Sequence, residues 1–224
     1  DFSIFISIVC TLVLIGFIFI YSSSSIYAIQ RYGCAHYYLK NQCLGALLGA
    51  LAFICARYFP HKLLFTLTPL LFFGSLFLTA LSLVPFFSLT IHGSSRWIHL
   101  GSFAFQPSEL LKISCVMYLA YFLTKRAHNS FTLKNMYLPF FSILATVAVI
   151  LLKQPDFGLA VTLVTTALSL LFISGIPLSH LMITAGALIP GIAALIIAQP
   201  YRLKRIATFL DPWKDAKGAG FQII

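Results

Sequence analysis

The chain has 224 residues, of which 60% are hydrophobic and 9% are charged, and its formal net charge is +10. A soluble domain of this composition would expose large apolar patches to water, so the composition excludes a soluble globular protein and predicts an integral membrane protein. The basic residues are scattered through predicted loops, without a basic helix or zinc-finger spacing. This pattern argues against nucleic acid as a partner and favours an anionic ligand.

Seven apolar runs approach or reach the length of about 20 residues that a spanning helix needs. They cover residues 2–21, 41–56, 63–84, 107–123, 137–152, 158–174 and 178–198. Ser22–Ser25 is predicted to be a loop after the first run, and the Gly45 and Gly49 pair in the second would let another helix approach closely. The predicted fold class is all-α, a polytopic membrane protein with a single membrane domain over residues 1–224.

The basic residues do not decide the orientation of these helices. With the N-terminus inside, five Lys and Arg fall in inner loops and nine in outer loops, which opposes the usual excess inside. Five of those nine, however, follow residue 198. The sequence begins without Met and stops in a polar segment, so we expect it to be a truncated piece of a longer protein.

The first of three polar segments runs from Arg96 to Lys112. Its stretch Gln106–Glu109 (QPSE) is typical of a helix start, because Pro is favoured at the first helical position and an acid in the first turn meets the positive helix end. Lys112 follows Glu109 by three residues and can pair with it. Glu109 is therefore either a residue of the helix cap or a functional carboxylate that an apolar helix retains at a cost.

The second polar segment, Lys153–Gly158, joins two apolar runs. Its Pro, Asp and Gly are ordinary turn residues, and Asp156 would cap the helix that follows. The predicted helices over residues 107–123 and 137–152 lead from the helix start near Glu109 to this turn, so both should lie on the same side of the membrane. If they converge, Glu109, Lys112 and Asp156 form a polar cluster at the head of a helix bundle.

The third segment contains Pro200–Arg205 followed by Phe209–Asp215, and its basic and apolar residues alternate as in an interfacial amphipathic helix. It is either an anchor for anionic lipid headgroups or a clamp for a phosphate-bearing lipid, with guanidinium groups as paired donors. No G-x-S-x-G, Walker loop or metal-binding spacing of histidines occurs, so the sequence predicts no metal site.

Together, these segments resemble the SEDS family (shape, elongation, division and sporulation), whose members include FtsW, RodA and SpoVE. The matching strings are Arg96-Trp97 with Gly101, FQPSELLK (105–112), QPDFG (154–158) and PYRLKRIATFLDPWKDAKGAGFQ (200–222). The strings at 21–25 and 38–42 and the DPWKD string are closer to FtsW and SpoVE than to RodA. The resemblance covers essentially the whole chain.

The resemblance implies a ten-helix fold in the bacterial inner (plasma) membrane, with a cytoplasmic N-terminus and a large extracytoplasmic loop that starts at residues 199–224. It implies a peptidoglycan glycosyltransferase that polymerises lipid II, an undecaprenyl-pyrophosphate disaccharide-pentapeptide, during cell-wall synthesis and cell division. The implied partners are a class B penicillin-binding transpeptidase and other divisome membrane proteins. The catalytic Asp of the family would follow residue 224, so we expect this piece to be inactive alone.

The resemblance also implies candidate site residues. Those for substrate binding are Arg96, Gln106, Lys112, Arg202 and Arg205. Their donors would stabilise the negative charge that develops as a pyrophosphate leaves. Glu109 and Asp156 are supporting candidates, which would order the cluster or position the acceptor sugar or a divalent cation. No catalytic residue is assigned within the chain, and no cofactor is identified.

Two other functions compete with polymerisation. The first is a lipid II flippase, because a buried polar cluster fits a translocation path as well as a catalytic cleft. The second is a non-catalytic divisome scaffold that binds a transpeptidase through its apolar helices.

Overall fold

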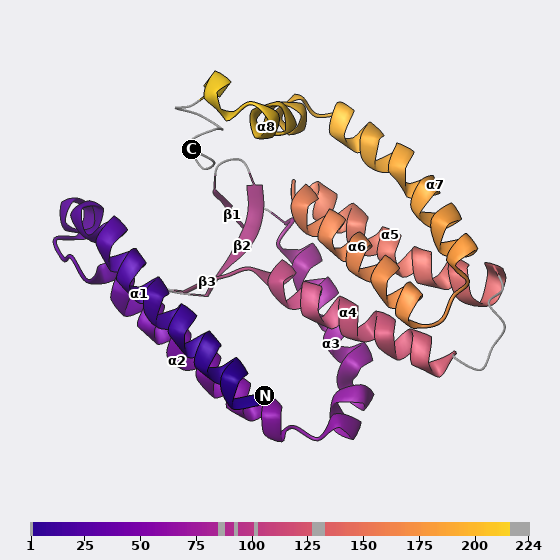
Figure 1. Cartoon of the computed structure of the whole chain (residues 1–224), viewed down its shortest axis with the longest axis horizontal. Helices are drawn as coiled ribbons and strands as arrows, with labels where there is room; N and C mark the ends of the chain where they lie inside the picture. Colours follow the sequence, from indigo (N-terminus) through magenta and orange to yellow (C-terminus); the bar gives the residue numbers. More distant parts are fainter. Residues whose placement is uncertain (1, 85–87, 92–93, 101–102, 127–132, 216–224) are drawn as a thin grey trace. The chain divides into compact units, whose positions relative to one another are not determined.

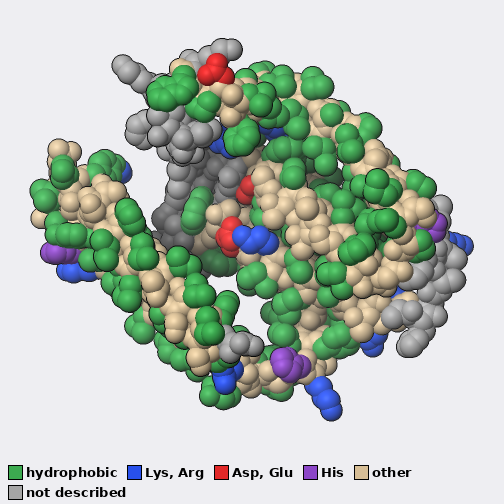
Figure 2. All heavy atoms as spheres, viewed as in Figure 1, with side chains coloured by type: hydrophobic (Ala, Val, Ile, Leu, Met, Phe, Trp, Pro, Cys, Tyr) green, Lys and Arg blue, Asp and Glu red, His purple; other side chains and the backbone are tan. Residues whose placement is uncertain are grey.

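The computed structural model describes residues 2–84, 88–91, 94–100, 103–126 and 133–215, which fold mainly into helices (Figure 1). The chain divides into two compact units, Asp1–Leu64 and Phe65–Ile224. Hydrophobic side chains are spread over the whole face shown in Figure 2, and charged ones are few. Such a surface is that of a membrane protein. The single membrane domain over residues 1–224 stays a prediction.

The first unit contains a hairpin of two long helices, α1 (Phe2–Tyr32) and α2 (Tyr37–Tyr58), which pack against each other. Ala28 is the only fully buried side chain among the residues that the structure describes in this unit. Helices with so little mutual burial are stable in a bilayer because their backbone hydrogen bonds are satisfied internally and their apolar faces meet lipid.

The predicted loop at Ser22–Ser25 is wrong, because α1 continues through it. The Ser23 hydroxyl donates to the carbonyl of Phe19 at 2.8 Å, and the Ser24 hydroxyl donates to the carbonyl of Ile20 at 2.6 Å. These bonds satisfy the hydroxyls within the helix, so a run of serines does not have to end it. Hydroxyls bonded to the preceding turn also tend to bend a helix.

The second unit holds the remaining helices. In chain order they are α3 (His61–Leu81, which begins in the first unit), α4 (Pro107–Lys125), α5 (Leu138–Lys153), α6 (Phe157–Ile173), α7 (Leu178–Ile197) and α8 (Pro200–Leu210). A π-helical turn (Leu133–Tyr137) precedes α5, and a 3-10 turn (Pro212–Asp215) follows α8. Helices α4, α5 and α6 pack against one another around a core that includes Leu111, Phe140 and Leu163.

Three short strands separate α3 from α4 in the chain. They are β1 (Ser88–Ile91), β2 (Ser94–Leu100) and β3 (Phe103–Phe105). The strands form an antiparallel sheet in the order β1-β2-β3, with Leu89 opposite Trp97 and Ile98 opposite Phe105. The all-α prediction missed this sheet, although glycines at 93 and 101 between short apolar stretches are a hairpin signal.

The predicted class, a polytopic helical membrane protein, is confirmed. In the part of the chain that the structure describes, the helices long and apolar enough to cross a membrane are α1, α2, α3, Lys134–Lys153 and α7. The other two predicted spans correspond to α4, whose first and last turns carry Glu109 and Lys125, and to α6, which is apolar but only 17 residues long.

A stripe of buried polar side chains runs along α3. Its members are Thr68, Ser75 and Thr79 on the helix, with Ser82 just after its end. The Ser75 hydroxyl lies 2.5 Å from the hydroxyl of Ser114 on α4, and either can donate. Hydrogen bonds of this kind between membrane helices contribute about 0.6 kcal/mol on average. The Ser75–Ser114 contact therefore helps to fix which face of α3 turns toward α4.

Candidate functional site

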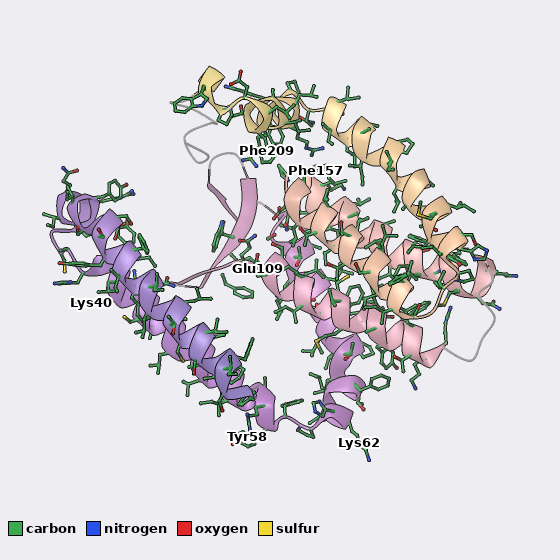
Figure 3. The ribbon with its side chains drawn as sticks, viewed as in Figure 1. Lys40, Tyr58, Lys62, Glu109, Phe157 and Phe209 are labelled. Atoms are coloured by element: carbon green, nitrogen blue, oxygen red, sulfur yellow. The ribbon has the colours of Figure 1, made fainter. Side chains whose placement is uncertain are left out.

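Four helix ends meet at one end of the second unit: the end of α3, the start of α4, the end of α5 and the start of α6. Helices α4 and α6 pack together, and Figure 3 shows Glu109 at the start of α4 and Phe157 at the start of α6, both at this end. Helix α4 carries the chain to the opposite end of the unit, and α5 returns it to this one. This is the arrangement that the spacing of the polar segments predicts.

Glu109 and Lys112 form an ion pair in the first turns of α4. The ammonium nitrogen of Lys112 lies 2.6 Å from Oε2 of Glu109. The Lys112 side chain is 37% exposed, and the Glu109 side chain is 56% exposed. The carboxylate also lies near the positive end of the helix, which favours its charge. The predicted pairing is present, and the geometry fits both readings of Glu109, as a residue of the helix start and as a functional carboxylate.

Gln106 and Arg96 lie just before this helix in the chain. Gln106 occupies the N-cap position of α4, and its Nε2 donates to the hydroxyl of Ser108 at 2.9 Å. Pro107 and Ser108 are buried, so the helix start is held in the core. Arg96 lies on β2, and its side chain is outside the described residues.

Gln154 fastens the second polar segment to the end of α3. Its side chain is 0% exposed, and its Nε2 donates to the carbonyl of Thr79 at 2.8 Å and to the hydroxyl of Ser82 at 2.6 Å. The sequence did not single out this residue, because a glutamine before a Pro-Asp turn is not by itself unusual. The two bonds place the turn that carries Asp156 against the polar stripe of α3.

Asp156 caps α6, as predicted. The backbone N–H of Leu159 donates to Oδ1 of Asp156 at 3.3 Å, and this satisfies one of the donors that a helix start leaves over. Its side chain is half-buried and also borders a cavity. Asp156 can therefore order the start of α6 and face a ligand at the same time.

The cavity lies between the turn before α6, the end of α7 and α8. Its volume is about 270 Å³. The lining residues are Pro155, Asp156, Phe157, Gly158, Ile196, Tyr201, Arg202, Arg205 and Ile206. It thus joins the second and third polar segments, while Glu109 and Lys112 lie at the start of α4, apart from the lining formed by the described residues.

Arg202 is the residue that holds α8 in place. Only 8% of it is exposed, and its guanidinium carbon lies 4.7 Å from the centroid of the Phe157 ring. Its Nη1 donates to the carbonyl of Leu195 near the end of α7, and its Nε donates to the hydroxyl of Tyr201 at 3.2 Å. Because these contacts engage much of the guanidinium, Arg202 acts first as a structural pin between α6, α7 and α8.

Arg205 is the more accessible cation of the cavity. Its side chain is exposed, and its guanidinium carbon lies 5.9 Å from the centroid of the Tyr201 ring. One turn of α8 separates it from Arg202, so both guanidinium groups reach the same cavity. Two cations against one carboxylate give the lining a net positive charge, which suits an anionic ligand.

Phe157 and Tyr201 are site residues that the sequence did not single out, although both stand inside the quoted motifs. The guanidinium of Arg202 lies over the Phe157 ring, and that of Arg205 lies over the Tyr201 ring. A cation over an aromatic face contributes about 0.5–2 kcal/mol, depending on its exposure. The sequence offers one signal for each residue: Phe157 is next to Asp156, and Tyr201 is next to Arg202. Aromatic neighbours are common in an apolar chain, so this signal is weak.

Helix α8 also exposes apolar side chains. Leu203 is 44% exposed and Leu210 is 79% exposed, whereas Phe209 (Figure 3), 74% exposed, follows Arg205 by one turn and lies on the same side of the helix. A helix with basic residues on one side and exposed apolar ones on the other lies at a membrane interface. Helix α8 combines the two predicted readings, because its exposed apolar residues fit an anchor while Arg202 and Arg205 line the cavity.

The cavity can hold a small anionic group rather than a whole lipid, because its volume is below the usual range for drug-sized ligands of about 300–1,000 Å³. Among the residues that the structure describes, no three His, Cys, Asp or Glu side chains gather as metal ligands would. The chemistry that this arrangement offers is cationic stabilisation of phosphate oxygens by guanidinium donors.

Comparison with protein families places this geometry in context. A family described as "Cell cycle protein" (FtsW, RodA and SpoVE) matches residues 2–224. Among individual proteins, the chain is 37% identical over 209 residues to the probable peptidoglycan glycosyltransferase FtsW of Geobacter sp. (strain M18), covering 93% of this chain and 57% of that protein. It is 32% identical to the stage V sporulation protein E of Bacillus subtilis (strain 168), covering 97% of this chain and 60% of that protein.

Solved structures give the same result. A chain from a peptidoglycan synthase complex that coordinates polymerization and crosslinking matches all of this chain with a TM-score of 0.76 and 30% identity, and 62% of that chain is covered. The rod shape determining protein RodA of Thermus thermophilus matches 82% of this chain with a TM-score of 0.60 and 28% identity, and 58% of it is covered. The chain thus spans about three fifths of the length of these relatives.

Proposed function

Because the chain belongs to the FtsW/RodA/SpoVE family of cell cycle proteins, we propose that it serves in a peptidoglycan glycosyltransferase that polymerises lipid II during bacterial cell-wall synthesis and cell division. Its relatives include proteins named probable peptidoglycan glycosyltransferase FtsW. As the chain spans about three fifths of such relatives, the activity is proposed for the whole protein.

The observation that carries this proposal is the cavity between the Asp156 turn and α8. Its guanidinium groups lie beside apolar helices, which is the combination needed for a substrate with a pyrophosphate and a polyprenyl tail. Glycosyl transfer from lipid II expels the pyrophosphate, and cations that meet the developing charge lower the barrier. In this proposal Arg205 binds the pyrophosphate, Arg202 holds α8, and proton abstraction falls to a carboxylate elsewhere in the whole protein.

The other predicted site residues keep their proposed roles. Lys112 and Gln106 supply further donors near the start of α4, Glu109 orders Lys112, and Arg96 remains a proposed substrate-binding residue. The proposed setting is the bacterial inner membrane, with a cytoplasmic N-terminus and the cavity facing outward. The proposed partner is a class B penicillin-binding transpeptidase, and the likeness to a peptidoglycan synthase complex supports it.

Purified whole protein tests this function directly. Lipid II in detergent should be converted into glycan polymers, because polymerisation needs no separate compartments. A flippase would leave lipid II unpolymerised in detergent but move it across sealed vesicles, and a scaffold would capture the transpeptidase while doing neither. Either of the last two results would contradict the proposed function.

Two substitutions of Asp156 can separate its role as a helix cap from a role of its negative charge. Asp156→Ala removes the cap and the charge and should sharply reduce polymerisation, whereas Asp156→Asn keeps an equally good cap and removes only the charge. For both variants, the polymerisation rate is measured in the lipid II assay and the melting temperature is measured separately, so that a loss of activity can be told from a loss of stability. If only Asp156→Asn polymerises like the wild type, Asp156 acts by capping the helix and its charge is not needed. If both variants polymerise like the wild type, Asp156 is not part of the site.

Glu109 and Lys112 should act as one unit. Glu109→Ala should sharply reduce polymerisation, Lys112→Ala should do the same, and the double variant should lose little more than either single variant, because each removes the same ion pair. The measurement is a double-mutant cycle on polymerisation rates. Losses that simply add would show that the two residues act separately.

A further inference from the structure

An aromatic cluster surrounds the turn between α1 and α2. The rings of Tyr32 and Tyr37 stack with centroids 3.9 Å apart, and the rings of Tyr27 and Tyr38 stack at 6.3 Å. Arg31 lies among them: its Nη1 donates to the hydroxyl of Tyr27 at 2.6 Å, and its guanidinium carbon is 5.7 Å from the centroid of the Tyr32 ring. The candidate site, which lies in the other unit, uses none of these residues.

The last turns of α1 fold over the end of the hairpin. Contacts along the hairpin pair Phe2 with Arg57 and Tyr21 with His36, so His36 and its neighbour Tyr37 are level with Tyr21. In a straight helix Tyr32 would lie about 16 Å further along the axis than Tyr21, too far for its ring to stack on Tyr37. We infer that α1 bends after Tyr21, where the serine hydroxyls bond back to the preceding turn (Figure 1).

The length of α1 puts this bent part at the membrane surface. Its 31 residues would extend about 46 Å, whereas the hydrocarbon core is about 30 Å thick. About ten residues must therefore lie outside the hydrocarbon. Because they turn across the hairpin end instead of continuing outward, they run along the interface, where tyrosine and tryptophan are enriched.

The composition of the bent part matches a lipid surface. Ile26 and Ile29 are 71% and 54% exposed and can enter the acyl boundary, while Ala28 is buried against the hairpin. Arg31 and Lys40 are exposed at the same end. The sequence from 2 to 64 contains no Asp or Glu, so nothing in this stretch neutralises them through a carboxylate.

We propose that residues Ser22–Lys40, the interfacial turn, bind anionic phospholipid headgroups at the membrane surface. Arg31 and Lys40 contact the phosphates, the tyrosines fill the headgroup layer, and the exposed isoleucines reach the acyl chains. A planar guanidinium keeps further N–H donors beyond the one used by Tyr27. This inference does not depend on the proposed enzymatic function.

Hydrogen exchange in nanodiscs tests the proposal. The full chain is placed in nanodiscs of phosphatidylcholine alone or of equal parts phosphatidylcholine and phosphatidylglycerol, and exchange is followed in peptides covering residues 22–36. Exchange should be at least about fivefold slower with phosphatidylglycerol, since one Lys or Arg near an anionic surface contributes about 1 kcal/mol. Arg31→Gln with Lys40→Gln should abolish the difference, whereas Arg31→Lys with Lys40→Arg should retain it.

The matched control is Arg57→Gln with Lys62→Gln, which removes two charges at the other end of the hairpin and should leave the lipid-dependent difference intact. Equal exchange in both nanodiscs, or the same loss in the control variant, would overturn the proposal. Slowing by inorganic phosphate in phosphatidylcholine nanodiscs would assign the effect to a free anion. Slowing that appears only when a partner protein is added would assign the surface to that protein. Each of these results contradicts binding to lipid.

Discussion

Replacing Arg205 by Gln in the whole protein is expected to lower the rate of lipid II polymerisation by about 100-fold. Removing one preorganised donor from a developing negative charge typically costs a factor of about 10²–10³. Arg205 lines the cavity and is exposed, so its loss should leave the fold intact. If it acts mainly in the transition state, kcat and kcat/KM should fall together. Initial rates at several lipid II concentrations provide the measurement.

Two neighbours on α8 provide the controls for this prediction. Lys204→Gln removes the same charge one position away, outside the described lining of the cavity, and should keep most of the activity. Arg202→Gln should lower both activity and melting temperature, because Arg202 joins α8 to Phe157 and to the carbonyl of Leu195. Equal losses for Lys204→Gln and Arg205→Gln would show that only the net charge of α8 matters.

The second large effect is expected at Gln154, on stability. Gln154→Leu keeps most of the side-chain volume but removes both hydrogen bonds to the end of α3. Loss of buried hydrogen bonds of this kind should lower the free energy of unfolding by about 1–3 kcal/mol. Thermal unfolding in detergent micelles measures the change. Polymerisation should fall as well, because the turn that carries Asp156 loses its attachment.

The matched control is Gln42→Leu, the same substitution at an exposed position of α2. A surface change of this kind should stay within about 0.5 kcal/mol. If Gln154→Leu unfolds at the same temperature as Gln42→Leu, the two bonds to α3 do not hold the site together.

The helices could be predicted from the sequence because each apolar run approaches or reaches the length that a bilayer demands. The exceptions have local causes. Ser22–Ser25 looked like a loop, since serine hydroxyls favour turns, but the hydroxyls of Ser23 and Ser24 bond to carbonyls of their own helix. The strands β1 to β3 are short, and their signal is weak beside the long apolar runs.

The candidate site was predictable at the level of segments and less so at the level of contacts. The Asp156 cap and the Glu109–Lys112 pair follow from local spacing, which is readable along a helix. The pin formed by Arg202 and the clamp formed by Gln154 join residues far apart in the chain. Such contacts depend on how helices pack, and packing leaves no short-range pattern in an apolar sequence.

The polar stripe of α3 has a consequence for the order of membrane insertion. Gln154 is synthesised 75 and 72 residues after its acceptors, Thr79 and Ser82, a delay of roughly 4–15 seconds at ribosomal speeds of about 5–20 residues per second. Meanwhile the hydroxyls of Thr79 and Ser82 already donate to carbonyls of the preceding turn. Helix α3 can therefore enter the bilayer without waiting for a partner. Gln154 arrives later, and its two hydrogen bonds then fasten the end of α5 to the end of α3.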